Sequence, residues 1–424
     1  MRRRLLLLTV AGLALRLLFL AFEPKVELAG DESSWVALGV QGLARLKHPL
    51  NPFSKHIIFY PPGYPYFIAV IYWLLGSLEA VKWFQALVGA SLVPAVGLMG
   101  ARTFGPRVGA VAAAIVAFYP ELIWFSVHFW SETLFMACLF WALERALRAD
   151  ADGRVGPAVA GGVLCGLAAL TRETALPVAP LAALWLAWPV RTAAARARGT
   201  AFLLAAVLTV VPWTARNWVV FHAFVPVSTF GPLNLWQGNA GLDRDEIYRQ
   251  SDSVEGPIAQ YRLAWARARE VIRARQPAWI FEKLRAELPA FFEPWSEVLS
   301  FMEDGVYGPV SGTRRRAIKA LLLPPYVVVV VLGFPALALF AWTRPRALLG
   351  LFLAYYVAIH VVAYGAHRFH LPVLPLLLIW SIALLAPGVA AKTSRRRWIA
   401  AACLLALITA CLFPGLVAGG PTPH

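Results

Sequence analysis

RRRLLLLTVAGLALRLLFLAF, residues 2–22, decides the fold, because three arginines stand directly before an apolar run that extends from Leu5 to Phe22. A helix of about 20 apolar residues spans the hydrocarbon core of a bilayer. This run is too long for the apolar region of a cleaved signal peptide, and no A-x-A cleavage site precedes Glu23. We therefore predict an uncleaved first membrane span with its N-terminus in the cytoplasm.

The rest of the chain repeats this pattern. Of its 424 residues, 59% are hydrophobic and 15% are charged, whereas soluble proteins carry roughly 25% charged residues. The run 108–119 is short and ends at Pro120, which predicts a partial or broken span. We predict an all-α polytopic membrane protein with about 11 to 12 transmembrane helices. The further apolar runs cover residues 62–75, 80–100, 108–119, 122–143, 155–170, 175–188, 201–213, 317–342, 347–364, 371–385 and 398–416.

The charges are distributed by segment. The formal net charge is +16, yet residues 217–316 hold 12 Lys and Arg against 12 Asp and Glu. The excess of positive charge lies in short connections, such as residues 2–4 and 392–397. Short basic connections face the cytoplasm, so we expect residues 217–316 on the outer side. Nucleic acid is excluded as a partner, because no basic face carries interleaved aromatic residues.

This topology predicts three parts. An N-terminal transmembrane module covers residues 1–216 and includes a first outer loop over residues 23–61. An outer loop of about 100 residues covers 217–316, and a C-terminal transmembrane module covers 317–424.

Helical spacing of apolar residues predicts three helices outside the spans. One covers residues 31–46 and is expected to lie in the membrane interface. Two amphipathic helices are expected near residues 258–275 and 277–292 of the long outer loop.

Carboxylates near membrane depth are the first candidate site residues, because charges there are costly and need a reason. Asp31 and Glu32 follow Gly30 at the head of the first outer loop. They either cap the interfacial helix or supply a general base for an attacking hydroxyl. Glu132 stands within an apolar stretch and must face either a cavity or an ion-pair partner such as Arg172.

Other polar residues gather at the outer ends of the spans. Arginine binds phosphate with two parallel hydrogen bonds, so these residues are expected to bind a phosphate group or another part of the substrate. They are Lys55, His56, Tyr60, Glu132, Arg172, Arg216, Asn217, His367 and Arg368. His367 and His370 lack a third clear ligand, and the four cysteines lie inside apolar runs, so no metal site is predicted.

The order of these motifs resembles a known family. Over about residues 5–390 the chain resembles the GT-C glycosyltransferases. It is most similar to the bacterial branch of the dolichyl-phosphate-mannose protein mannosyltransferases, which comprises family 39 and the aminoarabinose transferases. The motifs that carry the resemblance are Asp31-Glu32, YPPGYP at 60–65, SE at 131–132, LTRE at 170–173, PWTARN at 212–217, VPVSTFGPLNLWQGN at 225–239 and RFHLPVLPLL at 368–377.

The resemblance implies a GT-C-like helical bundle in the cytoplasmic membrane. It also implies a polyprenyl-monophosphate sugar donor, used with inversion on the periplasmic or outer face. Asp31 matches the family's acidic residue in the first outer loop, and Glu132 matches its second acidic position. Arg368 matches the arginine before the late L-P-x-L-P stretch, whereas Trp35 replaces a usual tyrosine and removes a hydroxyl. No cofactor or metal is expected, because the phosphate is already on the lipid.

Two alternatives stay open from the sequence. A transporter or flippase of lipid-linked sugars would also need buried charges, spread along a path through the bilayer. An outer-face glycan ligase or polymerase would share the topology. The Ala-, Arg- and Leu-rich composition favours a bacterial carrier, undecaprenyl phosphate. The sugar and the acceptor, which is a protein, a lipid or a glycan, are not specified.

Overall fold

The computed structural model describes residues 1–24, 26–47, 58–188, 192–386 and 394–413, which form helices and no strand. The helices of the first half are α1 (Arg2–Phe22), α2 (Asp31–Lys47), α3 (Gly63–Leu75), α4 (Leu78–Ala90), α5 (Leu92–Phe104), α6 (Pro106–Phe118), α7 (Pro120–Phe125), α8 (Glu132–Asp152), α9 (Val155–Thr171), the 3-10 helix η2 (Glu173–Ala175), α10 (Val178–Ala187) and α11 (Ala193–Phe221).

The second half begins with the hydrophilic segment, residues 217–316, and returns to apolar helices. Its helices are α12 (Phe230–Ala240), α13 (Arg244–Asp252), α14 (Pro257–Ala274), α15 (Trp279–Phe292), α16 (Glu297–Glu303), α17 (Gly312–Leu339), α18 (Arg344–Val362), the 3-10 helix η3 (His367–His370), α19 (Leu374–Leu385) and α20 (Arg395–Leu412).

The prediction of an all-α polytopic membrane protein is confirmed. Five shorter apolar helices accompany five long ones within the described ranges. The helical stretches that are long and apolar enough to cross a membrane are Arg2–Phe22, Leu78–Phe104, Ala193–Phe221, Gly312–Leu339 and Arg344–Val362.

The helices expected outside the spans are also present. The helix predicted over residues 31–46 is α2, and the two amphipathic helices are α14 and α15. The run predicted to end at Pro120 is α6, which stops at Phe118. The positions of prolines and the spacing of apolar residues therefore located these helices to within a few residues.

One predicted span is wrong. The apolar run 122–143 is interrupted, because α7 ends at Phe125 and α8 begins only at Glu132. The carbonyl oxygen of Phe125 instead accepts hydrogen bonds from Gln85 Nε2 at 2.9 Å and from Thr133 Oγ1 at 2.8 Å. Side chains thus satisfy the backbone that an unbroken helix would have satisfied itself. Glu132 is consequently the first residue of a helix, where the positive end of the helix dipole stabilises a carboxylate.

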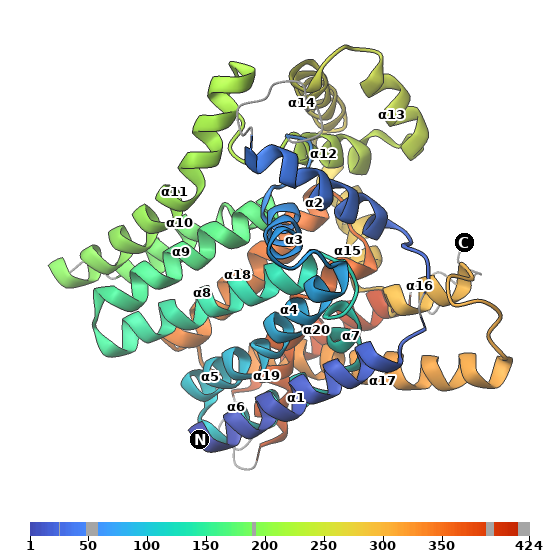
Figure 1. Cartoon of the computed structure of the whole chain (residues 1–424). Coiled ribbons are helices and arrows are strands. Elements are labelled where there is room, and N and C mark those ends of the chain that lie inside the picture. The colour runs from blue at the N-terminus through green and yellow to red at the C-terminus, as the bar shows by residue number, and fades with distance from the viewer. Residues whose placement is uncertain (25, 48–57, 189–191, 387–393, 414–424) are drawn as a thin grey trace.

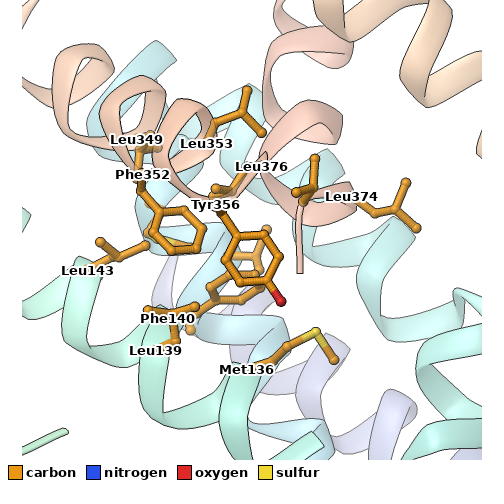
Figure 2. Close-up of a cluster of buried hydrophobic side chains, with 14 of the residues drawn as sticks. Met136, Leu139, Phe140, Leu143, Leu349, Phe352, Leu353, Tyr356, Leu374 and Leu376 are labelled. Carbon is orange, nitrogen blue, oxygen red and sulfur yellow. The ribbon is translucent and has the colours of Figure 1, made fainter. Parts of the chain in front are cut away.

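The core beneath this break is a seam of large apolar side chains from α8, α18 and α19. Figure 2 shows the rings of Phe140, Phe352 and Tyr356 among the leucines of these helices. Lipid is as apolar as leucine, so close packing holds such helices together in a membrane. The labelled members are Met136, Leu139, Phe140, Leu143, Leu349, Phe352, Leu353, Tyr356, Leu374 and Leu376, and all are buried.

Glycines bring α9 against α11. A Cβ atom on Gly162 would lie 2.2 Å from the carbonyl oxygen of Phe202, and one on Gly166 would lie 2.8 Å from that of Ala206. Because these neighbours are backbone atoms, they cannot move aside as a side chain would. Small residues at such crossings allow the close approach of two membrane helices.

Replacing Gly162 with Ala is therefore expected to lower the melting temperature of the detergent-solubilised protein, because overpacking costs about 1–3 kcal/mol. Gly156→Ala on the same helix is the control, since a Cβ there meets nothing within 4 Å. Equal melting temperatures for the two variants would contradict close packing at this crossing.

The hydrophilic segment, residues 217–316, packs partly on itself and partly on the bundle. Figure 1 shows α12, α13 and α14 together at the end of the molecule away from the N-terminus. Leu233, Trp236 and Ile247 form a buried cluster with α14. Phe291 and Phe292 of α15 are buried in the main core, which brings the end of α15 into the bundle.

Candidate functional site

Asp31 and Arg368 meet although 337 residues separate them in the chain. Asp31 is the first residue of α2, and its Oδ2 accepts a hydrogen bond from Arg368 Nη1 of η3 at 2.8 Å. Gly30 has φ +56°, which allows the tight entry into α2. The Asp31 side chain is 41% exposed and that of Arg368 is 26% exposed, so both are open to a ligand. This pair is the centre of the candidate site.

Aromatic rings surround the Arg368 guanidinium. It lies 5.4 Å from the ring centre of Trp130 and 5.2 Å from that of Phe369. Phe301 of α16 packs against Trp130, with ring centres 6.1 Å apart. Aromatic faces attract a cation and exclude water around it. The guanidinium is therefore held in a partly dry setting, where its charge acts more strongly than in water.

Glu132 and Arg172 form a second pair next to the first. Glu132 Oε1 lies 2.9 Å from Arg172 Nη2, and the Glu132 side chain is fully buried. The Arg172 guanidinium lies 5.6 Å from the ring centre of Phe369, the same ring that Arg368 contacts. Phe369 thus joins the two ion pairs. The ion pair to Arg172, one of the two interpretations of Glu132 open from the sequence, is present.

Glu32 has contacts that differ from those of its neighbour Asp31. It is 2% exposed, and its Oε1 accepts the backbone N–H of Phe129 at 2.8 Å. Its Oε2 accepts the N–H of Ala29 at 3.5 Å. Burial raises the pKa of Glu32 above its usual value, against the lowering effect of these two N–H groups. Glu32 ties the start of α2 to the segment that carries Trp130.

Glu32→Ala is expected to lower the melting temperature, because it leaves the buried Phe129 N–H without this acceptor, a loss of about 1–3 kcal/mol. Glu27→Ala, at an exposed position in the same loop, serves as the control. A Glu32→Ala protein as stable as the control would show that this tie contributes nothing.

His367 faces carboxylates from the hydrophilic segment. Its Nε2 lies 3.7 Å from Glu297 Oε2, and its Nδ1 lies 4.0 Å from Glu293 Oε2. Glu297 Oε1 also lies 3.7 Å from Arg368 Nη1. Sequence reasoning missed Glu297, Trp130 and Phe369, because no local pattern distinguishes them from ordinary helix-start and core residues. Only their position around Arg368 identifies them.

The remaining predicted site residues are less central. Lys55 and His56 lie outside the described residues. Tyr60 packs against Trp35 and Phe230, with ring centres 5.2 Å apart in each case. Trp35 therefore fills space beside the site where the family resemblance leads one to expect a tyrosine.

Arg216 and Asn217 lie at the end of α11. Asn217 Nδ2 donates to the carbonyl of Val225 at 2.9 Å. The Arg216 guanidinium lies over the rings of Trp213 and Phe221 and donates to Asn217 Oδ1 at 3.1 Å. These contacts hold the turn between α11 and α12. In the described part of the chain, no three His, Cys, Asp or Glu side chains are grouped as a metal site.

The chain matches one known family in part, and its fold is similar to that of solved structures. Residues 60–215 match the family model of the dolichyl-phosphate-mannose-protein mannosyltransferases. None of the curated proteins compared matches the sequence. The apo oligosaccharyltransferase of Archaeoglobus fulgidus has a similar structure, with a TM-score of 0.54 and 15% identity, over 99% of this chain and 56% of that one.

Two further structures are similar. The Archaeoglobus fulgidus oligosaccharyltransferase AglB, in complex with an inhibitory peptide and a dolichol-phosphate, gives a TM-score of 0.53 at 17% identity over 99% of this chain and 56% of that chain. ArnT of Cupriavidus metallidurans, bound to undecaprenyl phosphate, gives 0.47 at 16% identity over 98% of this chain and 66% of that chain. The last value is too low to carry an argument.

The chain spans just over half the length of the archaeal structures. Identities this low bear on the fold rather than on the activity. The helical architecture, the match over residues 60–215 and the archaeal structures agree with one another. The protein therefore has the fold of the GT-C glycosyltransferases, which confirms the resemblance drawn from its motifs.

Proposed function

We propose that the protein is a membrane glycosyltransferase. It transfers a sugar from a polyprenyl-monophosphate donor to an acceptor hydroxyl, with inversion at the anomeric carbon. The site faces the outer side of the cytoplasmic membrane, with the N-terminus of α1 in the cytoplasm. The observation that carries the proposal is the meeting of a carboxylate and a guanidinium, Asp31 and Arg368, from opposite ends of the chain.

The pair supplies the two groups that the reaction needs. A carboxylate within reach of an acceptor hydroxyl can take its proton as the oxygen attacks. A guanidinium beside the leaving phosphate can stabilise the charge that develops there. Glu32 is buried and bonded to backbone N–H groups. Asp31, the more exposed of the two carboxylates, is therefore assigned as the general base.

The step balances in atoms and charge. The acceptor oxygen forms a bond to the anomeric carbon as the bond from that carbon to the phosphate oxygen breaks. The acceptor proton passes to Asp31, whose single negative charge is neutralised. The donor is a phosphodiester with one negative charge, and the released polyprenyl phosphate carries two. Negative charge thus moves from Asp31 to the phosphate, beside Arg368.

The pairing of Asp31 with Arg368 describes the protein before substrate binds. A donor phosphate competes with Asp31 for the guanidinium, and its arrival releases the carboxylate to act as a base. Glu297, at 3.7 Å, remains beside Arg368 when Asp31 leaves it. Arg172, which shares the Phe369 ring, supplies a second positive charge toward the same phosphate.

The comparisons support the donor class. The matching family model describes enzymes of dolichyl-phosphate-mannose, and the archaeal structure with the same fold holds a dolichol-phosphate. The spans provide an apolar surface for the polyprenyl chain. We take undecaprenyl phosphate as the carrier, and we assign neither the sugar nor the acceptor.

The test is sugar transfer by purified protein in nanodiscs. Radiolabelled polyprenyl-phosphate sugars are supplied with a mixed pool of envelope acceptors, and labelled acceptor is separated from labelled lipid. Time-dependent transfer is expected. An absence of transfer with every donor, together with movement of the sugar lipid across vesicles, would replace the enzyme with a transporter.

A further inference from the structure

The segment that carries Arg368 is bonded to a largely buried ion pair in the hydrophilic segment. Lys283 of α15 is 4% exposed. Its Nζ lies 2.7 Å from Glu287 Oε1 and donates to the carbonyl of Gly238, at the end of α12, at 2.6 Å. Glu287 Oε2 accepts the backbone N–H of Gly365 at 2.7 Å. Gly365 lies three residues before Arg368.

The backbones around this ion pair approach one another closely. A Cβ atom on Gly238 would lie 1.7 Å from the carbonyl oxygen of Ala363, and one on Gly365 would lie 2.5 Å from that of Glu287. Asn239 Nδ2 donates to the carbonyl of Val362 at 3.1 Å. The end of α12, the middle of α15 and residues 362–365 therefore approach closely through their backbones, and the side chains of Asn239, Lys283 and Glu287 bond them to one another.

Stability alone is a poor reason for a charged pair in this place. Burying an ion pair incurs a large loss of hydration, and an apolar pair of similar volume often stabilises a protein equally well. Burial lowers the pKa of Lys283, against the raising effect of Glu287. A carboxylate adds a defined geometry here, because one oxygen accepts from the Lys283 ammonium group while the other accepts from the Gly365 N–H.

The position of the Arg368 guanidinium depends on this geometry. Its guanidinium is held at the tip by Asp31 at 2.8 Å, and the proposed reaction removes that contact. Afterwards its position depends on Glu297, on the neighbouring aromatic rings and on the backbone that carries it. A displacement of about 1 Å in a catalytic group can lower the rate about 100-fold.

We propose that Lys283 and Glu287 are positioning residues, which place the Arg368 guanidinium for the donor phosphate by anchoring residues 363–366 to α15 and α12. This role rests on the proposed function, and it makes the hydrophilic segment part of the catalytic apparatus. Neither residue touches the substrate.

The first experiment tests the anchor without an activity assay. Hydrogen–deuterium exchange of residues 363–370 is compared in the wild type, Glu287→Gln, Lys283→Met and the control Glu270→Gln. Glu270 pairs with Arg267 on the exposed face of α14. Faster exchange is expected in the first two variants alone. Wild-type exchange in both would overturn the proposal.

The second experiment is a double-mutant cycle on turnover. Glu287→Gln is expected to lower kcat about 10- to 100-fold and to leave the acceptor KM unchanged. In an Arg368→Ala background the same change is expected to have less than about a twofold effect, because the group it positions is gone. Equal effects in both backgrounds would show general damage to the fold and overturn the proposal.

The two experiments separate this inference from the proposed function. A wild-type protein without transferase activity contradicts the proposed function, whereas unchanged exchange in residues 363–370 contradicts the anchor. Glu287→Gln guards against a variant that fails to fold, because it has nearly the same shape and keeps one oxygen as an acceptor, whereas Lys283→Met leaves the Glu287 carboxylate without its cation.

Discussion

Asp31→Asn is expected to lower kcat by about 10²- to 10⁴-fold, the usual contribution of a general base. Asparagine has nearly the same shape but cannot take the acceptor proton. The rate is measured with a polyprenyl-phosphate sugar and the protein in nanodiscs, at saturating donor. Glu27→Gln, in the same loop and exposed, is the matched control and is expected to keep wild-type activity.

The same variant carries a second signature. Asp31 occupies Arg368 in the free protein, at 2.8 Å, so removal of its charge leaves the guanidinium freer to bind phosphate. Asp31→Asn is therefore expected to bind polyprenyl phosphate at least as tightly as the wild type. A variant that retains wild-type turnover would move the role of base to Glu32 or Glu132, and weaker binding of the lipid would contradict the competition for Arg368.

Arg368→Ala is expected to lower kcat by about 10²- to 10³-fold, since a single group that stabilises developing charge contributes about 3–4 kcal/mol. Unlike Asp31→Asn, it is also expected to weaken binding of polyprenyl phosphate. The side chain contacts Asp31, Glu297 and two aromatic rings, so its loss leaves two neighbouring carboxylates without their cation.

Two further variants sharpen this result. Arg368→Lys keeps the charge but cannot hold phosphate with two parallel bonds, and an intermediate rate is expected. Arg285→Ala, an exposed position on α15, is the control for loss of positive charge. An Arg368→Ala protein with normal turnover and normal lipid binding would remove Arg368 from the site.

Much of the fold followed from the sequence, because membrane helices are encoded locally. A helix satisfies its own backbone in lipid, so the length and polarity of a run nearly determine its structure. Residues 31–46, 258–275 and 277–292 also contained enough apolar spacing to predict α2, α14 and α15.

The break at residues 126–131 was not predictable in this way. The run is apolar and lacks a proline between Leu122 and Glu132. The helix is interrupted by hydrogen-bond partners far away in the chain. Gln85 donates to the carbonyl of Phe125, and Glu32 accepts the N–H of Phe129. A local pattern cannot register hydrogen bonds between segments that meet only after folding.

The site shows the same division. The sequence by itself determined a helical membrane protein and drew attention to Asp31, Glu132, Arg172 and Arg368 through their cost near the bilayer. Only the tertiary structure paired Asp31 with Arg368 and bonded Glu32 to the backbone N–H of Phe129. It also placed Lys283 and Glu287 beside the segment that carries Arg368. The physical reason is that burial in lipid is a property of a single segment, whereas a charge pair depends on the distance between two.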